Sequence, residues 1–407
     1  MNNKFTLVLM LCMAFFASQA SQKRKVLIIG IDGVRADALQ LAKTPNLDSL
    51  AANGLFTYNA WCLGITVSGP SWSTIMTGVW YPKHGVTDNS YVGSKYSTYP
   101  YFPTLAKQIK PNLNCIQVTE WNPMSDNVYN DGWNKKIKTG DDGNNYLTAQ
   151  IAAPILRDSA DLDVLFVYFD KVDLTGHALG FNPQIPAYIR AIESVDTTVG
   201  TVMKALYDRP NYANEDWLVL LTTDHGGIAK GHGGNTDDER RIWWIGTGTN
   251  IVKQQIFAQD PGSYRKSPFT VDSNLLKLSP VQADIAVTAL HHLIFDSGIH
   301  PKDQTQWNLD GKSWLERFTT GIEEPSNLPL VKIYPNPNRG LFTIWFENPS
   351  DEIVEYQLVD IGGKTVESGK TNSAHKLTVD ISNRAKGTYF AMVKTSKHTI
   401  SQKILIQ

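Results

Sequence analysis

Two histidines and an aspartate lie within nine residues in the stretch 222-TTDHGGIAKGHGG-234, among five glycines. Aspartate oxygens and imidazole nitrogens are ligands that divalent metal ions use in proteins. The glycines let the backbone fold back, so that His232 can approach the same point as Asp224 and His225. Whether this stretch is a metal site or a surface loop depends on which other side chains the fold brings to it.

Three more candidate ligands follow apolar runs elsewhere in the chain. Asp32 ends the run in 28-IIGIDG-33, and 172-VDLTGHALG-180 carries Asp173 and His177, whose spacing of four allows one helical turn to aim both at one ion. Two sets of three ligands result: Asp32, Asp224 and His225, and Asp173, His177 and His232. Each set leaves an open coordination position and suits catalytic Zn²⁺, although other divalent ions could use the same ligands. Two such ions about 4 Å apart can stabilise both oxygens of a displacement at phosphorus.

A nucleophile is expected in 66-TVSGPSWSTIMTG-78, where Gly69-Pro70 precedes a helical stretch. Ser68 would then lie at a helix N-terminus, where the free N–H groups favour an anionic oxygen. Ser71 would be close enough to donate a hydrogen bond to a phosphoryl oxygen. The alternative is that both serines only cap the helix, and that each candidate ligand alone is a turn former or a structural residue.

The elements that must position these residues are nearly continuous apolar runs. The runs 26-VLIIGI-31, 164-VLFVYF-169 and 217-WLVLLTT-223 are typical of strands buried on both faces of a parallel sheet. Helical periodicity covers about 186–207 and 46–52. We therefore predict an α/β fold, a mostly parallel sheet sandwiched by helices. Because the carboxyl ends of parallel strands meet at one edge, the candidate ligands should converge there.

Residues 90–145 show weak periodicity. We interpret them as an insertion beside the sheet, either a substrate-binding cap or a plain connection.

The chain divides into four expected segments. Residues 1–20 read as a signal peptide, with a short positive region, an apolar run too short for a membrane span and small residues before a cleavage site after Ala20. A catalytic domain over 21–322 and a linker over 323–330 follow. Residues 331–407 carry short alternating strands, with a turn at Gly362-Gly363, and predict a small all-β sandwich.

Composition excludes several classes of function. The formal net charge of −1 gives no basic surface for nucleic acid, and no later run is apolar and long enough to cross a bilayer. After signal cleavage only Cys62 and Cys115 remain, which could pair or stay as buried thiols.

Six motifs together resemble the alkaline phosphatase superfamily, in particular its nucleotide pyrophosphatase/phosphodiesterase-like branch. They are 28-IIGIDGVRADAL-39, 44-TPNLDSLAANG-54, 68-SGPSWSTIMTGVWYPKHG-85, 173-DLTGHALG-180, 223-TDHGG-227 and 232-HGG-234. The resemblance implies a two-zinc centre: Asp32, Asp224, His225 and the nucleophile Ser68 on one ion, and Asp173, His177 and His232 on the other.

The chain departs from that branch at two positions. Ser68 and Ser71 stand where the branch usually has threonine and asparagine, which leaves monoesters and diesters both open. The S-x-P-S stretch also looks like a sulfatase motif, but Trp72 replaces the arginine of the sulfatase modification signal, and Asp32 stands without the second aspartate of sulfatases.

The last residues carry a second resemblance. The motifs 333-IYPNPNRG-340, 387-GTYFAMV-393 and 403-KILIQ-407 resemble the C-terminal sorting domain of the type IX secretion system. This implies that the secretion machinery is a partner and that the protein is secreted or attached to the cell surface.

The sequence thus predicts a secreted two-zinc phosphoric ester hydrolase, a phosphodiesterase or phosphatase acting on a small-molecule ester through a phosphoseryl intermediate. The alternatives are a sulfatase or a phosphoethanolamine-type transferase of the same superfamily, or a noncatalytic surface protein.

Overall fold

The computed structural model describes residues 22–129, 131–249, 251–265, 270–315, 331–336, 338–346, 353–360, 364–372, 376–394 and 399–407. The chain forms two compact units, Met1–Thr319 and Thr320–Gln407. The expected signal peptide 1–20, the expected linker 323–330 and the expected turn at Gly362-Gly363 lie outside the described residues.

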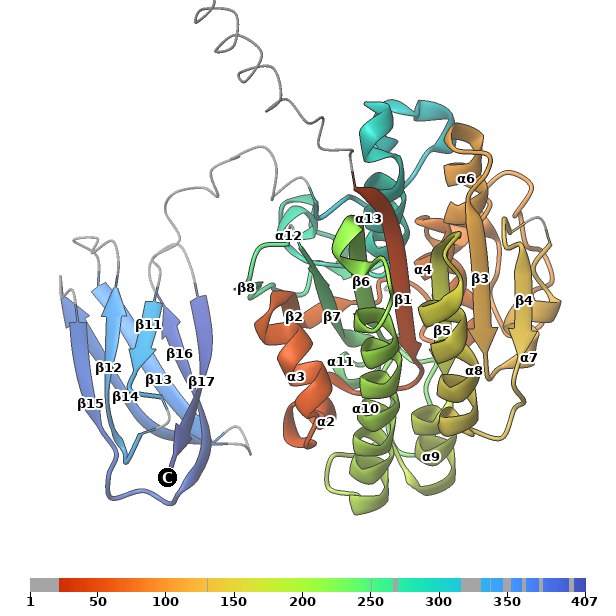
Figure 1. The fold of residues 1–407 in the computed structure, drawn as a ribbon. Coiled ribbons are helices and arrows are strands. Elements are labelled where there is room, and N and C mark those ends of the chain that lie inside the picture. Colours follow the sequence, from red (N-terminus) through yellow and green to blue (C-terminus); the bar gives the residue numbers. More distant parts are fainter. Residues whose placement is uncertain are drawn as a thin grey trace, which may run out of the picture. The chain divides into compact units, whose positions relative to one another are not determined.

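A mostly parallel sheet runs through the first unit (Figure 1), where eight described strands follow the order β4-β3-β5-β1-β6-β7-β2-β8. The strands are β1 (Lys23–Ile31), β2 (Gly54–Trp61), β3 (Asn114–Thr119), β4 (Lys135–Lys138), β5 (Leu162–Phe169), β6 (Glu215–Thr222), β7 (Arg241–Gly248) and β8 (Gln254–Gln255). Strand β1 lies between β5 and β6 and is parallel to both, with Ile28 beside Phe166 and Leu220. Among these described strands, β7 alone is antiparallel to its neighbours.

Both faces of the sheet are buried. On β1, Val26 and Ile28 belong to one hydrophobic core and Leu27 and Ile29 to another, and all four are fully buried. Burial on both faces explains why the predicted strands are apolar at nearly every position instead of alternating. The predicted fold class is confirmed.

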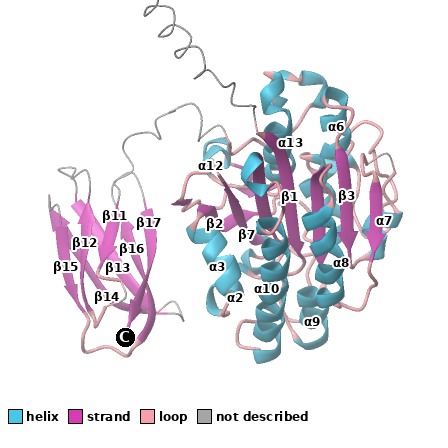
Figure 2. Ribbon diagram, in the orientation of Figure 1, coloured by secondary structure: helices cyan, strands magenta, loops and turns pink. Residues whose placement is uncertain are grey.

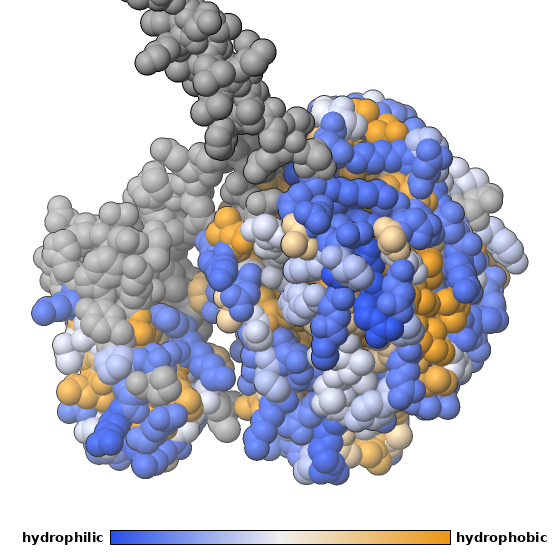
Figure 3. Space-filling view, in the orientation of Figure 1, coloured by the Kyte–Doolittle hydropathy of each residue, from blue (hydrophilic) through white to orange (hydrophobic). Residues whose placement is uncertain are grey.

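Helices cover the two faces (Figure 2). One core contains residues of α4 (Ser68–Thr77), α6 (Phe102–Ile109) and α13 (Asp284–Ile294), and the other contains residues of α2 (Ala36–Leu41), α3 (Pro45–Ala52), α8 (Asn145–Asp158) and α10 (Pro186–Tyr207). The remaining α-helices are α5 (Tyr81–His84), α7 (Asn122–Asp126), α9 (Lys171–Leu179), α11 (Asp237–Arg240) and α12 (Ser273–Leu278). Mostly hydrophilic side chains cover the outward face of α10 in Figure 3, as its amphipathic sequence requires. None of the described helices is both long and apolar enough to span a membrane.

Part of the segment 90–145, which was expected to lie beside the sheet as an insertion, belongs to the sheet itself. This segment contributes β3 and β4 to the sheet, and β3 pairs in parallel with β5. Its periodicity is weak for a physical reason: β4 is an edge strand with the sequence KKIK, whose lysines stay in solvent while Ile137 packs on the core.

The second unit contains two antiparallel sheets, counted over its described residues. Strands β11 (Val331–Tyr334), β12 (Leu341–Phe346) and β15 (Lys376–Asp380) form one, and β13 (Ile353–Asp360), β14 (Thr365–Asn372), β16 (Gly387–Lys394) and β17 (Thr399–Ile406) form the other. Phe342 and Ile344 of the first sheet share one hydrophobic core with Leu358, Ala391 and Ile404 of the second. Two sheets that share a core form the predicted β-sandwich.

Candidate metal centre

The candidate ligands lie where three neighbouring parallel strands end. Asp32 follows β1, Asp224 and His225 follow β6, and α9 with Asp173 begins directly after β5. The turn after Asp32 requires glycine, because Gly33 has a φ of +67° and a Cβ there would lie 2.6 Å from Asp173 Oδ1. The chain therefore packs the β1 turn closely against α9, which brings the two expected ligand sets together.

The first set is fully buried. His225 Nε2 lies 3.5 Å from Asp32 Oδ1 and 3.2 Å from Asp224 Oδ2, and the three side chains are 0% exposed. The three donor atoms lie within 4.8 Å of one another, close enough to bind one ion.

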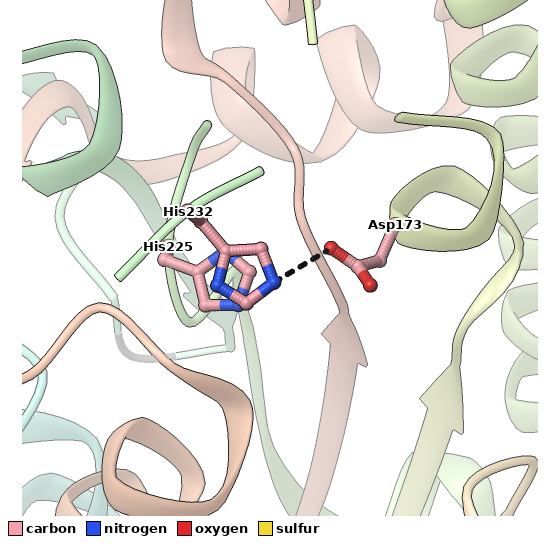
Figure 4. Close-up of side chains that lie close together, drawn as sticks. All are labelled: Asp173, His225 and His232. Carbon is pink, nitrogen blue, oxygen red and sulfur yellow. Dashed lines mark ion pairs between the residues drawn. The ribbon is translucent and has the colours of Figure 1, made fainter. Parts of the chain in front are cut away.

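The second set adjoins the first. On α9, Asp173 Oδ2 lies 3.2 Å from His177 Nε2, and His177 Nε2 lies 3.0 Å from His232 Nε2. Figure 4 shows the rings of His225 and His232 overlapping, with Asp173 facing them; the two ring centroids are 3.8 Å apart and Asp173 Oδ1 lies 3.7 Å from His232 Nε2. The structure thus brings all six predicted ligands into one compact centre.

Backbone carbonyl groups fix the orientation of all three histidines. The Nδ1 atoms of His177, His225 and His232 lie 3.0, 2.8 and 2.8 Å from the carbonyl oxygens of Lys230, Gly226 and Thr66. Because a carbonyl oxygen only accepts, each Nδ1 carries a proton, which leaves each Nε2 as the nitrogen that can bind a cation. This is the tautomer that a metal-binding histidine needs. Without a cation, the hydrogen bond that His177 Nε2 donates to Asp173 raises the pKa of His177 to about 9.

The carboxylates also fit a cation. Asp32 Oδ1, Asp173 Oδ1 and Asp224 Oδ2 are buried and have no hydrogen-bond partner among the described residues. Burial, and then the neighbouring carboxylates, raise the pKa of Asp32 and of Asp224. Burial would also raise the pKa of Asp173, but the hydrogen bond with His177 and the nearby imidazoles outweigh it and lower that pKa. Buried carboxylates without partners are costly unless a cation neutralises them.

Ser68 is the first residue of α4 and lies beside this centre. Its Oγ is 3.4 Å from His225 Nε2, and the residue is 6% exposed. The backbone N–H of Gly69 donates to Asn89 Oδ1 at 2.7 Å, which ties the start of α4 to Asn89. Ser68 and Asn89 line the same cavity as His177 and His232.

Ser71 does not face the same space. It is buried, and its hydroxyl donates to the carbonyl oxygen of Ile65 at 2.8 Å, with Cys62 Sγ 3.9 Å away. These contacts do not support the expected role of Ser71 in binding a phosphoryl oxygen.

An open cavity of about 400 Å³ gives access to the centre. Its described lining consists of Ser68, Asn89, Trp121, Pro123, Asp141, Asp170, Asp173, Leu174, His177 and His232. Among the aromatic residues of this region, Trp121 lines the cavity, whereas Trp133 packs on Phe166 with ring centroids 6.3 Å apart and Tyr129 is exposed.

Sequence reasoning missed four residues of this centre. Trp72 Nε1 and the Tyr168 hydroxyl donate to Asp32 Oδ2 at 2.8 and 2.5 Å, and the Tyr168 hydroxyl oxygen also lies 3.1 Å from Asp170 Oδ1. Burial, and then Asp32 and Asp173, raise the pKa of Asp170 to about 8. Asp170 directly follows β5, as Asp32 follows β1, and could have been found by the same criterion. No sequence signal marks Asn89, because it lies in a loop 20 residues from Gly69.

The other described histidines lie outside this centre. His84, His291 and His292 are buried in contacts with Thr74, Ser313 and the carbonyl oxygen of Asp216. Cys62 and Cys115 are both buried free thiols.

Comparison of the sequence with known proteins shows which family the chain belongs to. A model described as type I phosphodiesterase / nucleotide pyrophosphatase matches residues 26–231, half of the chain. Human ectonucleotide pyrophosphatase/phosphodiesterase family member 7 is 28% identical over 228 residues, which are 51% of this chain and 49% of the relative. A pyrophosphatase/phosphodiesterase of Schizosaccharomyces pombe, named as uncharacterized, is 26% identical over 54% of this chain and 46% of its own. The chain spans about half the length of the curated relatives it matches.

Two further findings concern the fold and the second unit. A solved 2-O GAG sulfatase superposes with a TM-score of 0.56 at 15% identity, over 89% of this chain and 86% of that chain, which shows a shared fold. A model described as secretion system C-terminal sorting domain matches residues 332–407 and indicates a secreted or cell-surface protein. The chain belongs to the type I phosphodiesterase/nucleotide pyrophosphatase family of the alkaline phosphatase superfamily, and it ends in a type IX secretion sorting domain.

Proposed function

We propose that the first unit is a two-zinc phosphodiester hydrolase in which Ser68 is the nucleophile. The observation that carries the proposal is the convergence of three histidine Nε2 atoms and three carboxylate oxygens without hydrogen-bond partners beside the Ser68 hydroxyl. Membership of the phosphodiesterase family supports an ester of phosphoric acid as the substrate. Mixed imidazole and carboxylate sets suit zinc, although other divalent ions could use the same ligands.

Each ion would have its own set of ligands. Asp32, Asp224 and His225, with Ser68, would hold one ion, and Asp173, His177 and His232 would hold the other. Bound zinc would lower the pKa of the Ser68 hydroxyl and offset the negative charge that develops on the attacking and leaving oxygens.

The reaction would proceed through two successive displacements at phosphorus. Ser68 Oγ attacks phosphorus and loses its proton to water, while the phosphorus–oxygen bond to the leaving alcohol breaks and that oxygen takes a proton from water. A water molecule next attacks phosphorus on the side opposite Ser68 Oγ and loses a proton, while the bond from phosphorus to Ser68 Oγ breaks and Ser68 Oγ takes a proton from water. Asn89 Oδ1 is held by the N–H of Gly69, so its amide NH₂ is free to donate to a phosphoryl oxygen in both steps. Two inversions give net retention at phosphorus.

Export accompanies this function. The sorting domain indicates secretion or surface attachment, and we propose that residues 1–20 are the signal peptide removed after Ala20. N-terminal sequencing of the exported protein should begin at Ser21.

The test compares three aryl esters. The purified protein should cleave bis(p-nitrophenyl) phosphate faster than p-nitrophenyl phosphate, and p-nitrophenyl sulfate least, with about two zinc ions per chain by elemental analysis. Ser68→Ala should lower kcat for the diester by at least about 10³-fold and keep most of the zinc, because three protein ligands per ion remain.

Ser49→Ala on the exposed face of α3 is the matched control and should retain activity. Full activity of Ser68→Ala, or diester hydrolysis unchanged after zinc is removed, would contradict the proposal.

A further inference from the structure

Three consecutive residues of the loop that carries His232 are bonded to a single threonine. His232 Nδ1 donates to the carbonyl oxygen of Thr66 at 2.8 Å. The N–H of Gly233 donates to the Thr66 hydroxyl at 3.1 Å, and that hydroxyl donates to the carbonyl oxygen of Gly234 at 2.8 Å. Thr66 is fully buried and lies outside both ligand sets. Because a hydroxyl has one proton and free lone pairs, Thr66 can donate and accept at the same time.

Thr66 also leads into the nucleophile, since Ser68 begins α4 two residues later. Val67, between them, lies against the same loop: Gly233 has a φ of +106°, and a Cβ there would lie 3.3 Å from Val67 Cγ2. The segment that carries Ser68 and the segment that carries His232 therefore pack together at Thr66, although Thr66 and His232 are 166 residues apart.

His232 differs in this respect from the other two candidate histidine ligands. The Nδ1 atoms of His177 and His225 bond to carbonyl groups of the loop that follows β6. The Nδ1 atom of His232 bonds instead to the segment that leads into Ser68. Thr66 is thus a direct link between the nucleophile of one ligand set and a histidine of the other.

Other segments hold the far side of the His232 loop. Glu239 Oε1 accepts from the N–H of Gly234 at 2.6 Å, and the exposed Arg265 donates to the carbonyl oxygens of Gly233 and Gly234. Neither Glu239 nor Arg265 lies in a segment that carries a candidate ligand. Because these bonds remain without the Thr66 hydroxyl, its loss should loosen the loop without releasing it.

The hydroxyl can affect ion binding because the loop is rich in glycine. Gly231, Gly233 and Gly234 flank His232. Glycine has more backbone freedom than other residues, so a ligand on such a loop is oriented only as well as the loop backbone is bonded. Groups that orient a metal ligand typically contribute about 10- to 100-fold to metal affinity.

We propose that Thr66 is a positioning residue for the second ligand set, which consists of Asp173, His177 and His232. Its hydroxyl holds the loop of His232 in the conformation that binds an ion, so the affinity of this set for its ion depends on that hydroxyl. The inference rests on the proposed function, because it requires that the second set binds an ion. Thr66 is not among the described residues that line the cavity, so its effect passes through His232 and not through contact with the substrate.

The test is titration of the full chain with zinc in competition with a chromogenic chelator. The wild type should bind two ions. Thr66→Val removes the hydroxyl and should weaken the binding of one ion by about tenfold or more, while the other changes by less than about twofold. Thr66→Ser keeps the hydroxyl and should restore the wild-type affinity to within about threefold. The free zinc concentration that gives half-maximal ester hydrolysis should shift in parallel.

Thr77→Val is the matched control on the same helix. The Thr77 hydroxyl, at the other end of α4, is also buried, donates to the carbonyl oxygen of Ser73 at 2.7 Å and accepts from the N–H of Val79 at 3.3 Å. Thr77→Val should therefore lower the melting temperature about as much as Thr66→Val but leave both zinc affinities unchanged. If Thr66→Val does not fold, Thr66→Ala, which places no methyl group against the loop, carries the same expectation for zinc.

A double variant shows whether the effect passes through His232. His232→Ala alone should weaken the binding of the same ion, because it removes a ligand. Adding Thr66→Val to His232→Ala should weaken that binding by no more than about twofold further, since the loop then carries no ligand to orient.

The outcomes distinguish this inference from the proposed function. Unchanged zinc affinity in Thr66→Val or Thr66→Ala, an equal loss in Thr77→Val, no restoration by Thr66→Ser, or a fully additive loss in the double variant would overturn the inference alone. A wild-type chain that binds two zinc ions but cleaves no phosphodiester would overturn the proposed hydrolase alone. Binding of fewer than two ions by the wild type would overturn both.

Discussion

At the scale of residues, hydrogen bonds from backbone and side chains orient the candidate ligands. Each of the three histidines donates its Nδ1 proton to a carbonyl oxygen, and Trp72 and Tyr168 both donate to Asp32 Oδ2. Held side chains lose little conformational entropy when they bind an ion, and their donor atoms keep the tautomer and orientation that binding needs.

A buried histidine outside the centre should make stability depend on pH. His84 is fully buried, its Nδ1 accepts the N–H of Val86 at 3.1 Å, and burial lowers its pKa from 6.5 to about 3. Below pH 6.5 the unfolded chain takes up a proton that the folded chain does not, so stability is complete above that pH and is lost toward pH 3.

The variant His84→Asn isolates this effect, because its Oδ1 can still accept the N–H of Val86. One pH unit within the window is worth up to about 1.4 kcal/mol, so the wild type should lose about 2 kcal/mol more unfolding free energy than His84→Asn between pH 7.5 and pH 5. Urea unfolding at the two pH values measures the difference. Equal losses in the two proteins would show that His84 is not the responsible group.

At the scale of elements, Phe181 joins the two segments that carry the ligands. Its ring lies 5.3 Å from the ring of His177 and 5.9 Å from that of His232, in edge-to-face contacts. Gly176 on α9 and Gly227 after β6 make room for it, since a Cβ at either would lie 2.3 or 2.4 Å from Phe181. The ring thus sets the distance between α9 and the loop that follows β6.

Adding one methyl group at this contact should disturb the metal centre. Gly176→Ala would push Phe181 away and destabilise the first unit by about 1–3 kcal/mol, and it should lower the zinc content at the set formed by Asp173, His177 and His232. Thermal unfolding and elemental analysis measure the two effects. Ala178→Ser, which adds one atom on the exposed side of α9, is the control. Adding Phe181→Leu to Gly176→Ala should restore part of the stability, and a lack of any restoration would argue against the contact.

At the scale of the whole molecule, the two units have separate hydrophobic cores. The described residues of the second unit bury Phe342, Ile344 and Leu358 among themselves, whereas every proposed site residue lies in the first unit. The division agrees with the family models, of which one matches 26–231 and the other 332–407.

Removal of the second unit should therefore leave the rate of ester hydrolysis by the first unit nearly unchanged. A chain that ends at Thr319 should keep kcat/KM for bis(p-nitrophenyl) phosphate within about twofold and should melt within about 2 °C of the same transition in the full chain. Calorimetry and ester hydrolysis check both expectations. Loss of activity in a folded, zinc-loaded fragment would show that the sorting domain contributes to the site.

Much of this protein could be predicted from sequence alone because the relevant signals are local. The predicted helix 186–207 coincides with α10, and the apolar runs from 26, 164 and 217 lie in β1, β5 and β6. The periodicity of apolar residues is visible in neighbouring positions of the sequence, so these helices and strands can be predicted without knowing which distant segments they contact. The six candidate ligands stood out because carboxylates and imidazoles follow those strands, and parallel strands end at one edge of a sheet.

Tertiary structure decided the features that depend on distant pairs and on side-chain direction. Tyr168 and Asp32 are 136 residues apart, yet they share a hydrogen bond, and Asn89 reaches the start of α4 from a loop without periodicity. Ser71 could equally have faced the cavity, but the carbonyl oxygen of Ile65 lies within reach of its hydroxyl and holds it. Strands β3 and β4 belong to the sheet because β3 pairs with β5 and β4 pairs with β3. Their weak local periodicity does not predict these pairings. Such pairs cannot be predicted from local sequence, because each contact forms only when segments far apart in sequence are already neighbours in space.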